Sequence, residues 1–187
     1  MIRLIFLILV PTFFFHSFGQ NINLKDISPF PIGTSVRIQP FLKDKKLVDL
    51  QKRHFNSITS GNDMKMYEII KTEGVYYWDR IDTIVNYAKT NNQRMFGHNL
   101  IWHFSTPRWV RNKARKNPAW LDKFLKEYIT EYVSRYKGVI HGWDVVNEAF
   151  EASGGEYRKE SIWYEIMGKQ YIEKAFRYAH EVDPDAI

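Results

Sequence analysis

Short apolar, β-branched segments alternate along the chain with longer segments in which apolar residues recur every three or four positions. The short segments have the character of strands, and the longer ones have the period of amphipathic helices. Four such pairs are predicted, with strands at 31–36, 55–59, 95–102 and 139–146 and helices at 42–54, 78–89, 118–136 and 162–181. This order is typical of βα units repeated around a parallel sheet, so we predict a single α/β domain.

The first nineteen residues differ in character from the rest. Arg3 supplies a positive start, and an apolar run extends from Leu4 to Phe15. The run is about half of the roughly 20 residues that a spanning helix needs, and Pro11 interrupts it. We therefore predict a secretory signal peptide at 1–19 and the domain of the mature protein at 20–187. The product would be secreted or periplasmic, with no membrane partner after removal of the signal.

The charged residues of the chain are dispersed. Lys and Arg number 27 and Asp and Glu 21, which gives a net charge of +6. The two signs do not gather into a basic run, so we expect no nucleic-acid partner. The chain has no cysteine, which excludes disulfides, thiolate metal sites and a cysteine nucleophile. Any chemistry must therefore use carboxylates, histidines or hydroxyl groups.

Polar side chains suited to such chemistry occur where the predicted strands end. The carboxyl ends of parallel strands meet at one edge of a sheet, which is where α/β proteins bind their ligands. Three groups fall there: Asn62, Asp63 and Lys65 after the second strand, His98, Trp102 and His103 on or just after the third, and Asn147 and Glu148 at the end of the fourth.

Glu148 is the candidate general acid. It follows the apolar run from Trp143 to Val146, and a carboxyl group beside apolar walls favours its protonated form, as a general acid requires. By position alone, Glu148 could equally cap the next segment or pair with a lysine. Neighbours in a regular strand point to opposite faces, so Asn147 and Glu148 can face one ligand only if the chain bends or bulges there.

The two histidines of the third group do not favour a metal site. Five residues apart in a strand, His98 and His103 point to opposite faces, and no third ligand follows at a known spacing. We expect neither a metal nor a cofactor, since the sequence also has no phosphate-binding glycine loop and no G-x-S-x-G turn. Trp102 and Trp109 flank His103, and their rings could stack on the apolar face of a sugar. An uncharged, hydroxyl-rich substrate fits these side chains best.

Two segments carry a specific resemblance. The sequences G-H-N-L-I-W-H at 97–103 and G-W-D-V-V-N-E-A at 142–149 resemble glycoside hydrolase family 10, the retaining endo-1,4-β-xylanases. The likeness extends through residues 30–33, 56–65, 106–109, 171–176 and 183–186. It implies a (β/α)8 TIM barrel, of which this chain holds about the first four βα units. It also implies that the substrate is xylan or a related β-1,4-linked polysaccharide and that the reaction is its hydrolysis.

The resemblance also implies roles for individual residues. Glu148 matches the acid/base, Asn147 the residue that bonds the 2-hydroxyl of the attacked sugar, and His103 a supporting residue. Glycone-side binding residues are matched by Asn62, Lys65, His98 and Trp102. In the retaining mechanism, Glu148 would protonate the leaving oxygen and later deprotonate water. A second carboxylate roughly 5–5.5 Å away would form the glycosyl-enzyme intermediate.

The chain departs from the family pattern in its binding segments. Gly61 stands where a glutamate is common, Met66 where a tryptophan is usual, and Ser105 where a glutamine is frequent. We expect these changes to trim the glycone subsites and to alter sugar preference or affinity rather than the reaction.

The family's nucleophile, a glutamate at the end of the seventh strand, has no counterpart in this sequence. The remaining candidates all lie in the fourth loop or helix and match nothing: Glu151, Glu156, Glu160 and Glu165. We therefore expect the N-terminal half of a secreted xylanase that is inactive by itself. Two alternatives stay open, a non-catalytic or degenerate xylan-binding protein and a related (β/α)8 glycosidase that acts on another β-glycan.

Overall fold

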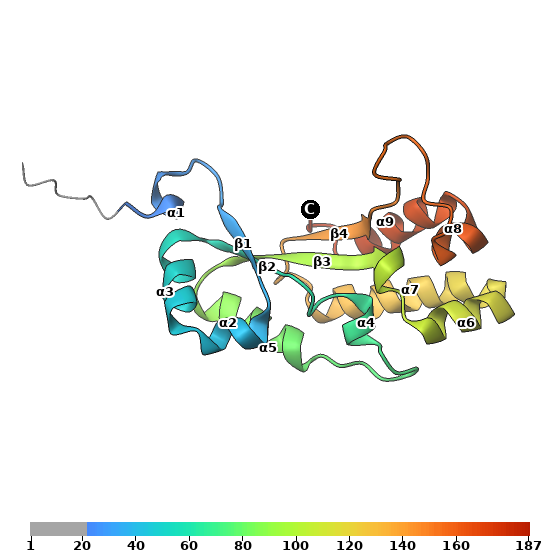
Figure 1. Cartoon of the computed structure of the whole chain (residues 1–187), viewed down its shortest axis with the longest axis horizontal. Helices are drawn as coiled ribbons and strands as arrows, with labels where there is room; N and C mark the ends of the chain where they lie inside the picture. The colour runs from blue at the N-terminus through green and yellow to red at the C-terminus, as the bar shows by residue number, and fades with distance from the viewer. Residues whose placement is uncertain (1–21) are drawn as a thin grey trace, which may run out of the picture.

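The computed structural model describes residues 22–187, so the predicted signal peptide at 1–19 lies outside the described residues. Four parallel strands form one sheet in the order β1-β2-β3-β4. They are Gly33–Val36 (β1), Ser57–Ser60 (β2), Arg94–Trp102 (β3) and Gly142–Asn147 (β4). Helices follow every strand (Figure 1). The predicted βα order is confirmed, and the arrangement fits part of a (β/α)8 barrel.

The helices are more numerous than the sequence pattern predicts. The short α1, Leu24–Ile27, precedes β1. The others are α2 (Ile38–Lys43) and α3 (Lys45–His54) after β1, α4 (Met66–Ile69) and α5 (Asp79–Thr90) after β2, α6 (Arg108–Lys116) and α7 (Pro118–Arg135) after β3, and α8 (Ile162–Met167) and α9 (Gln170–Val182) after β4. A 3-10 turn, His103–Ser105, joins β3 to α6.

Local features divide two helices that were predicted as single ones. Asp44 separates α2 from α3, because its side chain accepts hydrogen bonds from the backbone N–H groups of Lys46 and Leu47 and so caps α3. Gly168, with φ of 59°, ends α8, and this left-handed conformation favours glycine. The last helix ends just before Asp183 and Pro184, as predicted.

The core lies between one face of the sheet and the helices. Ile58 of β2 pairs in register with Met95 of β3, and both are buried. The helix after β3 contributes a continuous buried stripe, which confirms its predicted packing role: Leu121, Phe124, Leu125, Tyr128, Ile129, Tyr132 and Val133. On the opposite face, Thr59 and Phe96 form a register pair that stays half-buried. This is the face that would line the interior of a closed barrel.

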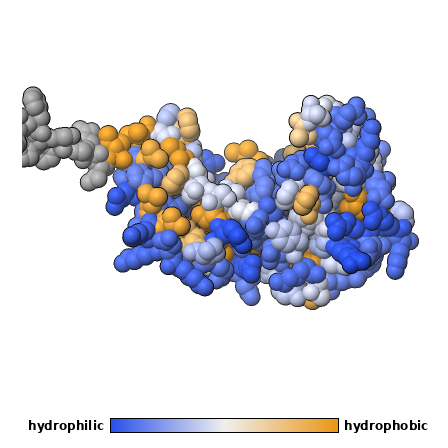
Figure 2. All heavy atoms as spheres, in the orientation of Figure 1, coloured by the Kyte–Doolittle hydropathy of each residue, from blue (hydrophilic) through white to orange (hydrophobic). Residues whose placement is uncertain are grey.

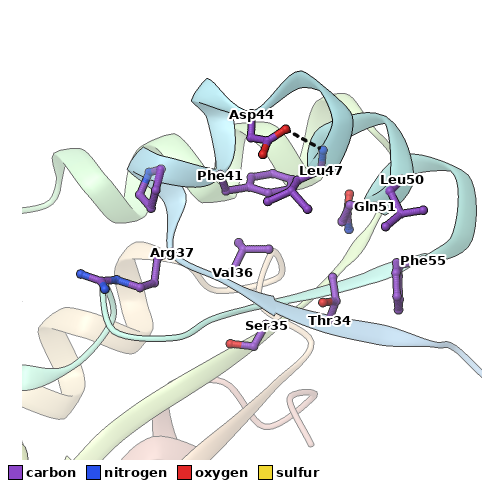
Figure 3. A pocket seen from close by; sticks show the side chains of 11 residues that line it. Thr34, Ser35, Val36, Arg37, Phe41, Asp44, Leu47, Leu50, Gln51 and Phe55 are labelled. Atoms are coloured by element: carbon purple, nitrogen blue, oxygen red, sulfur yellow. Dashed lines mark hydrogen bonds between the residues drawn. The ribbon is translucent and has the colours of Figure 1, made fainter.

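The outer side of β1 is bordered by an apolar groove of about 450 Å³ between this strand and helices α2 and α3. In Figure 3, the side chains of Phe41 and Leu47 lie over Val36 of β1. Leu47 and Leu50 are about half exposed, and hydrophobic residues gather at this end of the molecule in Figure 2. Within residues 22–187, β1 has no strand neighbour other than β2.

The other edge of the sheet carries one further backbone pairing. Ile187 donates its N–H to the carbonyl of His141 at 3.0 Å and accepts from the N–H of Trp143 at 2.8 Å. These are the hydrogen bonds of a parallel strand that pairs with β4. No helix in the described part of the chain is both long and apolar enough to cross a membrane.

Candidate active site

The carboxyl ends of β2, β3 and β4 bring four of the predicted residues into one continuous set of contacts. Lys65 donates to Oδ1 of Asn62 at 2.9 Å. The same ammonium lies 4.6 Å from the centroid of the Trp102 ring, a cation–π distance. The indole Nε1–H of Trp102 in turn donates to Oε2 of Glu148 at 2.8 Å. Residues from three separate βα units therefore meet at the predicted edge.

Lys65 and Glu148 also interact through their charges. Burial lowers the pKa of the Lys65 ammonium, and the negative charge of Glu148 acts in the opposite direction and raises it. Trp102 connects the two groups, because its ring faces the ammonium of Lys65 and its indole N–H binds the carboxylate of Glu148. The ammonium of Lys65, in the loop after β2, and the carboxylate of Glu148, at the end of β4, thus belong to the same site.

The backbone bends where β4 ends. Glu148 has φ of 52°, a left-handed conformation that is uncommon for residues other than glycine. Asn147, the last residue of β4, still pairs in register with Trp102. The predicted bend is therefore confirmed. Within residues 22–187, Trp143 and Val145 are buried whereas Glu148 is exposed, so these residues do not enclose Glu148 in the apolar walls that the sequence predicts.

His98 lies farther down β3 than the other predicted residues. Its Nδ1 is 2.7 Å from Oδ2 of Asp144, and the two residues are register partners in β3 and β4. Sequence reasoning missed Asp144 as part of the site. Its signal was its position three residues before Asn147 in the motif, which places it on β4 opposite a histidine of β3.

His103 packs beside the contact set rather than within it. Its ring meets the Trp102 ring edge-on at 5.9 Å. Burial lowers the pKa of His103, and the positive charge of Arg158 lowers it further, whereas Glu148 and Glu160 raise it. Its neutral form is therefore favoured. Across residues 22–187, no three side chains of the metal-binding types gather into a potential metal site.

Trp109 does not lie where the sequence places it. Its indole donates to the carbonyl of Ile70 at 2.7 Å, and its ring packs against Trp120 and Phe124. Trp109 is therefore a packing residue, because α6 turns it toward α7. Phe104 takes the position beside the site instead. It is 75% exposed and stacks on Trp102 with 5.6 Å between the ring centroids.

The three departures from the family pattern differ in their exposure. Met66 and Ser105 are both fully buried, and Ser105 donates its hydroxyl to the carbonyl of Trp102 at 3.1 Å. Gly61 is half-buried in the loop after β2. Ser105 thus supports the backbone of a site residue, and Met66 belongs to the core.

A family model described as Glycosyl hydrolase family 10 matches residues 23–187. The chain belongs to glycosyl hydrolase family 10. Among family 10 relatives, a "Beta-1,4-xylanase" of Dictyoglomus thermophilum is 44% identical over 138 residues, or 74% of this chain and 38% of that protein. "Endo-1,4-beta-xylanase A" of Xylanibacter ruminicola is 40% identical over 172 residues, or 88% of this chain and 46% of that protein.

Solved family 10 structures share the fold. Native xylanase 10B from Thermotoga maritima superposes with a TM-score of 0.80 at 35% identity, over 89% of this chain and 52% of that one. These neighbours are (β/α)8 barrels. The chain therefore spans about half of such a barrel, and between 14% and 38% of the length of the first three curated relatives.

Proposed function

We propose that this chain provides the acid/base half of a secreted endo-1,4-β-xylanase that hydrolyses xylan with retention of anomeric configuration. Its membership of family 10 and the names of its relatives support a glycoside hydrolase that acts on xylan. The observation that carries the proposal is the hydrogen bond from Trp102 to Glu148 at the carboxyl edge of the sheet. It places an exposed carboxyl group among residues suited to binding a sugar.

Glu148 is the proton donor in this proposal. Its Oε2 accepts the indole hydrogen of Trp102, and within residues 22–187 no hydrogen bond engages Oε1. The free oxygen donates its proton to the leaving glycosidic oxygen as the C1–O bond breaks. In the second step, the same carboxylate takes a proton from the water that attacks C1, so one residue serves as acid and then as base.

The neighbouring side chains hold the sugar that is attacked. Asn62, Lys65 and Trp102 bind the glycone side of the substrate. The ammonium of Lys65 donates hydrogen bonds to sugar hydroxyl groups, and the amide of Asn62 both donates and accepts them. Asn147 bonds the 2-hydroxyl, and His98, held by Asp144 at 2.7 Å, presents its other ring nitrogen to the substrate. His103 supports Trp102 through the edge-on contact of their rings. The nucleophile is a second carboxylate outside these 187 residues, about 5–5.5 Å from Glu148 in the assembled site.

Secretion belongs to the proposal because xylan is a polymer too large to enter a cell. The sequence of residues 1–19 has the character of a signal peptide.

Another β-glycan is the second candidate substrate. A relative named "Exoglucanase XynX" from Acetivibrio thermocellus is 38% identical over 166 residues, and Gly61, in the loop after β2, departs from the family pattern. Comparing the rates on xylan, cellulose and mixed-linkage glucan separates the two candidates.

Substitution of Glu148 tests the proposal. In the full-length protein, Glu148→Gln keeps the shape of the side chain and its acceptor oxygen but removes the acid. We expect the release of reducing sugar from xylan to fall by about 10²–10⁴-fold, the usual contribution of general acid–base catalysis. Glu156→Gln, an exposed position in the following loop, is the control. Equal activity of wild type and Glu148→Gln would refute the role of Glu148.

A further inference from the structure

The loop between β4 and α8 folds back on itself directly after Glu148. Phe150 and Tyr157 form an antiparallel bridge, and their rings stack with 4.9 Å between the centroids. The N–H of Arg158 donates to the carbonyl of Ala149 at 2.9 Å. In Figure 1 this loop stands out from the body of the molecule between the ends of β4 and α8. Its two arms are therefore joined at the base, next to the carboxylate.

One side chain ties this base together. The guanidinium of Arg158 donates through Nε to the carbonyl of Glu148 at 3.2 Å and through a terminal nitrogen to the carbonyl of Phe150 at 3.3 Å. Its other terminal nitrogen contacts Glu160 at 3.0 Å and Glu151 at 3.2 Å. The Arg158 side chain is only 16% exposed. All three nitrogens of the guanidinium are engaged, and two of them bind the backbone that carries the candidate acid.

The backbone at Glu148 needs such support. Glu148 has φ of 52°, a conformation that is strained for a residue other than glycine. Such a conformation persists only when the surrounding structure holds it in place. The conformation determines where the carboxyl group points, because the bend moves it away from the regular strand direction. The carbonyl that Arg158 binds belongs to the strained residue itself.

We propose that Arg158 is a positioning residue for Glu148, which fixes the left-handed backbone of the acid and thereby the direction of its carboxyl group. The inference rests on the proposed function, since it assumes that Glu148 delivers a proton. Glu151 and Glu160 hold the guanidinium in orientation from the other side. A planar guanidinium can reach two carbonyls and two carboxylates at once, whereas the single ammonium of a lysine cannot.

A pair of substrates separates positioning from mere stabilisation of the loop. A xylo-oligosaccharide has a sugar leaving group that needs a proton, whereas a 2,4-dinitrophenyl β-xylobioside has a leaving group that needs none. The kcat/KM for both substrates reports the first step, in which only the oligosaccharide depends on the acid. We expect Arg158→Lys in the full-length protein to lower kcat/KM about tenfold for the oligosaccharide and less than about twofold for the dinitrophenyl substrate.

A matched substitution controls for the loss of an arginine. Arg115 binds Glu165 through two nitrogens at 3.2 and 3.0 Å, and this exposed pair links α6 to α8 away from Glu148. Arg115→Lys should keep both kcat/KM values of the wild type. Glu148→Gln gives the reference for a lost acid, with a large loss on the oligosaccharide and little loss on the dinitrophenyl substrate.

The outcomes decide between the two proposals. If Glu148→Gln loses both activities equally or neither, the proposed function of Glu148 fails. If Glu148→Gln behaves as an acid variant but Arg158→Lys keeps the wild-type ratio of the two kcat/KM values, the positioning role of Arg158 is overturned. Failure of Arg158→Lys to fold, measured by thermal unfolding, would assign Arg158 to stability alone and overturn it as well.

Discussion

The indole of Trp102 occupies one oxygen of Glu148 and leaves the other to the substrate. Its ring also lies against Lys65 and Phe104, so the orientation of the indole is held by several contacts. A hydrogen bond to a charged group contributes about 1.5–3 kcal/mol. Trp102 is therefore expected to orient Glu148 in addition to contacting a sugar.

Replacing Trp102 by phenylalanine removes the hydrogen-bond donor and keeps an aromatic surface. In the full-length protein we expect kcat/KM for xylan to fall about 10- to 100-fold, which corresponds to the loss of a hydrogen bond to a charged group. Steady-state kinetics measure the change. Trp120→Phe is the control, since Trp120 stacks on Phe124 on the helical side. Unchanged kcat/KM in Trp102→Phe would show that the indole hydrogen has no part in orienting the acid.

Strands β3 and β4 pack closely because two glycines lack side chains. A Cβ atom at Gly97 would overlap the ring of Trp143, and one at Gly142 would lie 2.7 Å from a ring carbon of Phe96. The rings of Trp143 and Phe96 thus fill the space that a side chain would take on the adjacent strand. This contact aligns the two strands that carry Trp102 and Glu148.

Gly97→Ala should disturb this alignment. The added methyl group forces the Trp143 ring to move, and overpacking of this kind typically costs about 1–3 kcal/mol of the free energy of unfolding. Gly33→Ala in β1 is the matched control, because its Cβ would lie 3.4 Å from Cβ of Ser57, an ordinary contact. Urea denaturation of the full-length protein measures both variants. Equal midpoints for the two variants would contradict the packing of Gly97 against Trp143.

The strands and long helices could be predicted from sequence because their apolar periodicity is strong. Helix α7, with seven buried apolar residues, was the clearest case. Helix α6 escaped prediction because lysines and arginines outnumber its two buried residues, Val110 and Ala114. The strand β4 begins at Gly142 rather than Val139, because the N–H groups of Val139 and Ile140 turn back to the carbonyl of Tyr136.

The sequence was sufficient to name several residues of the site but not to predict their backbone conformation or their supporting contacts. Strand ends and motifs were enough to name Asn62, Lys65, Trp102 and Glu148, which are in contact. The left-handed backbone of Glu148 was not predicted, because no residue propensity indicates it. Arg158 was missed because its contacts depend on the fold of the loop between β4 and α8. In the sequence it is one arginine among many charged residues.

At the scale of the whole molecule, the four strands of residues 22–187 form an open sheet rather than a closed barrel. The half-buried face of β2 and β3 and the groove of about 450 Å³ beside β1 expose apolar surface that a closed barrel would cover. Exposed apolar patches of this kind often mark surfaces that another part of a protein covers. An unpaired strand edge adds a tendency to associate.

Residues 20–187 produced alone should therefore be a loosely packed protein. We expect broad thermal unfolding and strong binding of the dye ANS, since the half-buried face of β2 and β3 and the groove beside β1 are accessible to solvent. The same residues alone should release no reducing sugar from xylan, because Glu148 has no second carboxylate as nucleophile. The full-length protein is the control for both measurements. A sharp unfolding transition without dye binding would contradict the expectation of an open half-barrel.

The assignment of Glu148 as acid/base in a retaining glycosidase can be tested by chemical rescue. Glu148→Ala in the full-length protein still forms the glycosyl-enzyme from a dinitrophenyl β-xylobioside, but water then attacks slowly because the base is missing. Azide needs no base, so it attacks C1 and displaces the enzyme carboxylate, and the account predicts faster turnover with β-xylobiosyl azide as the product in an NMR spectrum. Formation of the α-azide, or no rescue at all, would contradict the assignment of Glu148 as the acid/base.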